Sequence, residues 1–90
     1  NTATGIGGGG GISNTAGLLN LINTSFTENS ATGLVGGGAI SVFGNSILNI
    51  VNSSFERNSA VSDGGAIFNE GSTLNLIATA GNQTIFTGNS

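Results

Sequence analysis

The sequence of 90 residues contains no cysteine, histidine or lysine, and its single basic residue is Arg57. Without cysteine, neither disulfide bonds nor thiolate metal sites can stabilise the fold, and either redox compartment is compatible with the chain. A formal net charge of -3 excludes the clustered lysines and arginines that bind nucleic acid or an anionic membrane. The apolar residues fall in short runs broken by Gly and Asn, so no run approaches the roughly 20 residues of a membrane-spanning helix.

What the sequence does contain is one pattern repeated three times, at residues 9–29, 37–58 and 64–89. Each copy opens with Gly-Gly-(Gly/Ala)-Ile, continues with Leu-Asn-(Leu/Ile) and closes with Phe-x-x-Asn. The closing asparagines are Asn29, Asn58 and Asn89, and Asn1 resembles the tail of a preceding copy. A period of about 29 residues is typical of a solenoid or another repeat array. We therefore expect one segment of a longer array, with repeats at about 1–29, 30–58 and 59–89.

Short runs within each copy alternate between apolar and polar residues, as in residues 47–51 and 73–77. Such alternation predicts half-buried strands, and no segment keeps the i, i+3, i+4 spacing of a helix of about 10 to 12 residues. If strands of successive copies stack about 4.8 Å apart, equivalent residues form ladders along the array. Inward ladders are expected from the opening isoleucines, the aliphatic residues beside each central asparagine and the phenylalanines: Ile12, Ile40, Ile67; Leu19, Leu48, Leu74; Leu21, Ile50, Leu76; Phe26, Phe55, Phe86.

The same alternation predicts outward positions. Asn20, Asn49 and Asn75 are expected to stack as an exposed amide ladder. The residues that follow the opening isoleucines are expected to point outward, with the aromatic one as the most exposed candidate for a partner contact: Ser13, Ser41, Phe68. The inverted alternation, with Ala39 and Ala66 inside, stays open.

The closing asparagines predict a ladder of turns, because asparagine tolerates left-handed φ angles and bonds to neighbouring backbone groups. In the third copy Phe86 follows Leu76 by ten positions, whereas the corresponding separation in the other copies is five. The surplus within residues 78–84 is expected either to bulge out as a loop, where contacts are often made, or to lengthen one side of the solenoid.

Motifs that carry chemistry are few. Residues 5–10 satisfy GxGxxG, but dinucleotide binding needs a helix after that motif and none is expected. Glu28 and Glu56 lie in neighbouring copies, so their carboxylates could approach as in a glycoside hydrolase, although a solvated corner is the simpler interpretation. A single aspartate excludes the calcium-binding nonapeptide repeat. N-glycosylation sequons, which arise easily by chance in such a composition, begin at Asn23, Asn52 and Asn82.

The ordered pairs GGGI/FTEN, GGAI/FERN and GGAI/FTGN resemble the repeats of chlamydial polymorphic membrane proteins and related bacterial autotransporter adhesins. The resemblance covers essentially the whole chain. It implies a right-handed parallel β-helix passenger that is exported across the outer membrane, displayed at the cell surface and used to adhere to host cells. The motif residues that carry it are Gly10, Gly11, Ile12, Phe26, Asn29; Gly37, Gly38, Ala39, Ile40, Phe55, Asn58; Gly64, Gly65, Ala66, Ile67, Phe86, Asn89.

We therefore expect an all-β chain that folds as a three-sided parallel β-helix of three turns, with an interior of Ile, Leu and Phe ladders. The expected function is that of a structural and adhesive segment of an extracellular bacterial surface adhesin. The alternative is a subunit of an extracellular filament that assembles end to end through open strands. Neither enzymatic activity nor a cofactor or metal is expected. The expected partners are adjacent turns or copies of the chain and a host-cell or surface receptor, without nucleic acid or membrane insertion.

Overall fold

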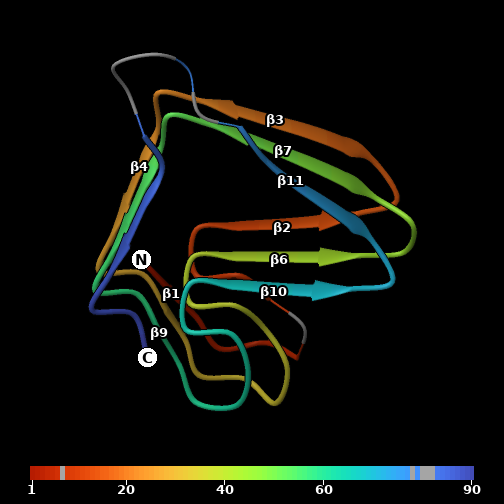
Figure 1. The fold of residues 1–90 in the computed structure, drawn as a ribbon. Coiled ribbons are helices and arrows are strands. Elements are labelled where there is room, and N and C mark those ends of the chain that lie inside the picture. Colours follow the sequence, from red (N-terminus) through yellow and green to blue (C-terminus); the bar gives the residue numbers. More distant parts are fainter. Residues whose placement is uncertain (7, 78, 80–82) are drawn as a thin grey trace.

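The computed structural model describes residues 1–6, 8–77, 79 and 83–90, which form twelve short strands and no helix. The strands follow one another in groups of four, one group to a turn (Figure 1). Their bounds are β1 Thr2–Ala3, β2 Ile12–Thr15, β3 Leu18–Ile22, β4 Ser25–Thr27, β5 Ser30–Ala31, β6 Ile40–Phe43, β7 Ile47–Val51, β8 Ser54–Glu56, β9 Ser59–Ala60, β10 Ile67–Glu70, β11 Thr73–Ile77 and β12 Ile85–Thr87.

All strand pairs are parallel and join one turn to the next. The three long sheets have the orders β10-β6-β2, β11-β7-β3 and β12-β8-β4. Seen along the stack in Figure 1, they form the three sides of a triangle. The expected parallel β-helix of three turns is confirmed. The strand register stacks chemically equivalent residues, since Asn49 of β7 pairs with both Asn20 and Asn75.

A fourth sheet, β1-β5-β9, is a feature that the expected three-sided outline lacks. Its two-residue strands leave the triangle and lead into the long connections that return to β6 and β10 (Figure 1). Two residues are too short for an alternating pattern, so the hydrophobic periodicity of the sequence could not indicate this sheet.

The core lies inside the triangle and is made mainly of aliphatic ladders. Its fully buried members come from the middle turn: Ala39, Ile40, Val42, Leu48, Ile50 and Phe55. The outer turns contribute residues packed against this cluster, among them Ile12, Leu19, Ile67 and Leu74. Burial therefore depends on having a turn on each side, as expected where each repeat contacts only its neighbours.

Both Ala39 and Ile40 lie in the core, which answers the question of alternation that the sequence left open. The carbonyl of Ala66 accepts hydrogen bonds from both Ala39 N (2.8 Å) and Ile40 N (3.0 Å). The two N–H groups share one acceptor because the backbone bends at Ala39, directly before β6 begins, and the bend breaks the alternation of side chains. The predicted inward position of the opening isoleucines is confirmed, and Ala39 and Ala66 lie inside as well, because the bend turns two consecutive side chains inward.

The outer face of β6 is also covered, which alternation alone did not predict. Ser41 points away from the core as expected but is fully buried, and its Oγ accepts a hydrogen bond from Gly37 N at 2.8 Å. The prediction that Phe68 is the most exposed of its group was wrong. Its ring packs against Phe43 with centroids 5.5 Å apart, so it is only half exposed.

The phenylalanines form a stack along the third sheet. Phe55 lies between Phe26 and Phe86, with centroid distances of 5.1 and 4.8 Å and interplanar angles of 5°. These distances correspond to offset stacking, which adds to the energy of burial. The ring of Phe55 is fully buried, whereas Phe86 in the third turn is 43% exposed.

We expect Phe55→Ala to reduce the free energy of unfolding by about 3 to 5 kcal/mol, because it opens a cavity and removes both stacking contacts. Phe86→Ala is the matched control, and it should cost clearly less because Phe86 has one stacked neighbour and is partly exposed. Urea unfolding followed by circular dichroism measures both values. Equal losses would show that the stack does not concentrate stability in the middle turn.

Candidate functional site

Each turn closes where the end of the Phe-x-x-Asn-Ser motif meets the Gly-Gly pair of the same turn, and we call this region the closing corner. Ser59, at the start of β9, lies beside Gly38, which precedes β6. Ser30 lies in the same way beside Gly10, and Ser90 beside Gly65. The two motifs that define the repeat are therefore halves of one structural contact.

The second glycine of each pair leaves no room for a side chain. A Cβ on Gly38 would overlap the carbonyl oxygen of Gly65 and approach Ser59 N. A Cβ on Gly10 or on Gly65 would likewise overlap backbone atoms. Since backbone atoms cannot rotate away as a side chain can, these positions require glycine for close approach rather than for an unusual φ angle.

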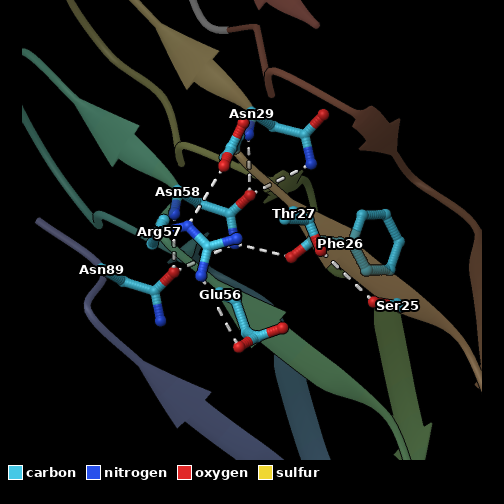
Figure 2. Close-up of polar contacts among 9 residues, drawn as sticks. Ser25, Phe26, Thr27, Asn29, Glu56, Arg57, Asn58 and Asn89 are labelled. Carbon is cyan, nitrogen blue, oxygen red and sulfur yellow. Dashed lines mark hydrogen bonds and ion pairs between the residues drawn. The ribbon is translucent and has the colours of Figure 1, made fainter.

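The asparagines of the closing corner form a hydrogen-bonded ladder, shown in Figure 2. Asn58 Oδ1 accepts from Asn29 N at 2.9 Å and from Asn29 Nδ2 at 3.0 Å. Asn58 Nδ2 donates to Asn89 Oδ1 at 2.9 Å and to the carbonyl of Phe26 at 3.0 Å. All four hydrogen-bonding positions of this fully buried amide are thus used, which is how a polar group is buried at little cost.

The predicted ladder of asparagines is confirmed, but the left-handed φ angles that asparagine tolerates are not found at the asparagines themselves. The positive φ angles at this corner belong to the preceding residues, Glu28 (57°), Arg57 (51°) and Gly88 (63°). The turn at those residues directs the asparagine side chain inward, where its amide bonds to the neighbouring turn. Glutamate and arginine are unusual in this conformation, and each costs about 1 to 2 kcal/mol relative to glycine-like freedom.

The outer surface of the closing corner carries charge. Arg57 Nε lies 3.1 Å from Glu28 Oε1, and Arg57 Nη1 lies 3.8 Å from Glu56 Oε1. The preferred interpretation of this region as a solvated corner is confirmed by the exposure of these side chains. The alternative of two free, paired carboxylates is not supported, because the guanidinium lies against both and Glu56 is in register with Thr27 and Thr87. These side chains are largely exposed, so the ion pairs contribute little to stability.

The other two corners use hydroxyl ladders that the sequence analysis missed. Ser46 Oγ accepts from Gly17 N at 3.1 Å, and Ser72 Oγ accepts from Ser46 N at 3.0 Å. Ser53 Oγ accepts from Thr24 N at 3.1 Å in the same way. The available signal was a serine or threonine directly before β4, β7, β8, β11 and β12, whereas Gly17 precedes β3.

Several other predicted features have only a partial structural description. Gly7 of the glycine run lies outside the described residues, as do residues 78 and 80–82 of the expected loop, including the sequon residue Asn82. Beside that loop, Asn52 Nδ2 donates to Thr79 Oγ1 at 2.9 Å. A hollow of about 240 Å³ lies at the third turn and is lined by Leu76, Ile77, Gln83, Thr84 and Phe86.

Within the described part of the chain, no group of three or more His, Cys, Asp or Glu residues is placed to hold a metal ion. The same residues include no helix long and apolar enough to cross a membrane.

The motif residues divide into three classes of burial. The buried ones are Gly10, Phe26, Asn29, Gly37, Gly38, Ala39, Ile40, Phe55, Asn58 and Ala66. The half-buried ones are Ile12, Gly65, Ile67 and Asn89. The exposed ones are Gly11, Gly64 and Phe86. In the middle turn all six motif residues are buried, so the motif there contributes to packing and to buried hydrogen bonds rather than to the exposed surface.

A stack of parallel strands with glycine and asparagine ladders at one corner defines the class: a parallel β-helix built from sequence repeats. Residues 23–42 and 52–70 match the model of the Chlamydia polymorphic membrane protein repeat. Each matched segment runs from the turn before β4 or β8, through the Phe-x-x-Asn motif, to the next Gly-Gly-Ala-Ile strand. The resemblance carried by the motifs is thereby confirmed. Neither the curated proteins nor the solved structures gave a match.

We expect Gly38→Ala to reduce the free energy of unfolding by about 1 to 3 kcal/mol or more, because the new methyl group must displace backbone. Gly5→Ala is the control, since a Cβ there meets nothing within 4 Å and Gly5 has no positive φ angle. Urea unfolding of the two variants should separate them. A loss for Gly38→Ala no larger than that for Gly5→Ala would contradict the close approach.

We expect Asn58→Asp to destabilise the fold by at least about 3 kcal/mol at pH 7, because a buried carboxylate would face the acceptors that Asn58 Nδ2 now serves. Desolvation would raise the pKa of the new carboxyl in the folded state above the usual value of about 3.9. The deficit relative to the natural chain should therefore be smallest below about pH 4 and grow as the pH rises.

The matched control is Asn75→Asp, because Asn75 lies in the exposed ladder and donates a single side-chain bond, to Asn49. It should cost less than about 1 kcal/mol. Unfolding curves at pH 3.5 and 7, at about 0.15 M salt to screen surface charges, supply the comparison. A deficit for Asn58→Asp that does not change with pH would refute the buried-carboxylate argument.

Proposed function

We propose that this chain is part of a rigid β-helical rod displayed on a bacterial cell surface, in the manner of an adhesin passenger. The observation that carries the proposal is that both segments matching the Chlamydia polymorphic membrane protein repeat include the closing corner and the strands joined to it. The family is named for membrane proteins, and in this proposal the chain forms part of the rod that such a protein displays.

Rigidity follows from how the turns are joined. Backbone hydrogen bonds link each strand to its equivalent in the next turn, and the asparagine ladder adds buried side-chain bonds at one corner. The chain extends 38 × 27 × 15 Å, and each turn adds about 4.8 Å along the axis. A longer array of such turns forms a stiff rod, which suits the presentation of a binding surface away from a membrane.

The proposal assigns no catalytic role to this segment. The acidic residues on the outer surface of the closing corner form ion pairs with Arg57. These side chains are exposed to water and do not line an enclosed site. The partner we propose is a receptor on another cell, contacted by outward-facing residues rather than by the buried motif.

A second candidate is a filament that grows by stacking of one chain on another. It is favoured by the apolar surface of the third turn, where Leu76 and Phe86 are about half exposed while their equivalents Ile50 and Phe55 are fully buried. A further turn covers this surface equally well whether it belongs to the same chain or to another copy.

The experiment is surface proteolysis of intact bacteria that produce the natural protein, followed by mass spectrometry and by immunogold electron microscopy. Peptides from residues 1–90 should be released from intact cells while a cytoplasmic marker stays protected, and the gold label should lie at the cell surface. Protection of the segment until the cells are lysed would refute surface display. Label along filaments that a denaturant dissociates into single chains would replace the rod with the stacking subunit.

A further inference from the structure

The outward side of the β3-β7-β11 sheet is unusually apolar for an exposed surface. Leu18 is 63% exposed and Ile22 is 61% exposed, and Ile47 and Ile77 are also exposed. We call this side the lateral face; its members are Leu18, Asn20, Ile22, Ile47, Asn49, Val51, Thr73, Asn75 and Ile77. In Figure 1 it is the upper side of the triangle.

The strand register arranges these residues in three parallel ladders. Leu18, Ile47 and Thr73 form the first ladder, and Ile22, Val51 and Ile77 form the third. The asparagine ladder between them is bonded to itself, with Asn49 Nδ2 to Asn20 Oδ1 at 2.9 Å and Asn75 Nδ2 to Asn49 Oδ1 at 2.8 Å. Because these amides bond along the ladder, the strip can be covered with fewer lost water contacts than free amides would require.

Charge favours an uncharged, self-complementary partner. None of the nine residues of the lateral face is ionisable, although the chain carries a formal net charge of -3. The ionisable side chains lie elsewhere, at the closing corner, in the β9–β10 connection and at the end of β10: Glu28, Glu56, Arg57; Asp63; Glu70. Cores of protein interfaces are depleted in charge in this way. Two copies can therefore bring these faces together without opposing like charges.

Geometry selects a second copy among uncharged partners. The turns of any copy repeat at about 4.8 Å, so the ridges on two such faces keep the same spacing over any number of turns. A two-fold axis in the face, passing Asn49 and parallel to the strands or to the solenoid axis, brings apolar ladder onto apolar ladder and amide ladder onto amide ladder. We propose that the lateral face pairs with the lateral face of a second copy, so that two β-helices lie side by side.

The area available sets the strength of this pairing. Five aliphatic side chains, each burying about 60 to 120 Å², give about 300 to 600 Å² per copy. A standard stable interface buries about 800 Å² per partner, so three turns should pair only weakly, with a dissociation constant on the order of 0.1 to 1 mM. Each further turn in a longer array adds to the same two apolar ladders.

The first test is a concentration series of ¹⁵N–¹H spectra of the natural chain, from about 20 μM to about 2 mM, which brackets the expected dissociation constant. Amide signals of β3, β7 and β11 should shift with concentration, including those of the central strand β7. Shifts confined to the first and last turns would indicate end-to-end stacking, and an absence of shifts would indicate no pairing. Either result would overturn the proposal.

A different partner would give its own result. Shifts at the lateral face that require an added macromolecule, and do not follow the concentration of the chain, would assign the face to that partner and would also overturn the proposal.

The second test uses variants with a matched control. Leu18→Thr combined with Ile47→Thr makes the first ladder resemble Thr73, a residue that the same position already accepts. Leu34→Thr combined with Val61→Thr removes similar exposed apolar surface, 71% and 75% exposed, from the connections outside the lateral face. The first pair should weaken self-association at least tenfold in sedimentation equilibrium, and the control pair should change it less than twofold.

Both variants alter exposed side chains, so equal urea midpoints should confirm that the fold is retained. If the two pairs of substitutions weakened self-association equally, general surface hydrophobicity would explain the association, and the proposal would be overturned.

Discussion

The structure depends on one constraint: each turn must close on itself at the place where the next turn will stack. The closure is made by a backbone approach at Gly38 that leaves no space for a side chain, and by Asn58, which satisfies a buried corner with four hydrogen bonds. Because parallel strands need equivalent residues in register, a small displacement at this corner would be repeated in every sheet. Register is strongly specified when one face is buried, and here the corner fixes it once per turn.

The fold was predictable because its signals are local and repeated. The spacing of Asn29, Asn58 and Asn89 gives the turn, and alternation around Asn49 gives the strand that faces both core and solvent. The recurrence of the same pattern in three copies is stronger evidence for the fold than the propensity of any single segment. The residues of the closing corner were predictable from the sequence, but their geometry was not. The recurring asparagine is visible in the sequence, whereas the residue with a left-handed φ angle before it differs in each copy, being Glu28, Arg57 or Gly88.

What the sequence could not indicate comes from contacts between segments that have no pattern of their own. The bend that turns both Ala39 and Ile40 inward is accompanied by the sharing of one carbonyl acceptor, that of Ala66. The burial of Ser41 depends on the glycine-rich connection that covers the outer side of β6. Both features involve backbone packing, which hydrophobic periodicity does not encode.

The motifs that identify the repeat are also the residues with the least access to a partner. Phe55, Ala39 and Asn58 are fully buried, and Gly38 is enclosed by backbone. A substitution at these positions therefore acts on the fold rather than on the exposed surface. The proposed adhesive role therefore assigns recognition to outward positions, where the same ladder holds leucine, isoleucine or threonine within one fold, at Leu18, Ile47 and Thr73. In this architecture the repeat motif specifies the scaffold, and the outward ladders are the positions at which the surface can vary while the fold stays the same.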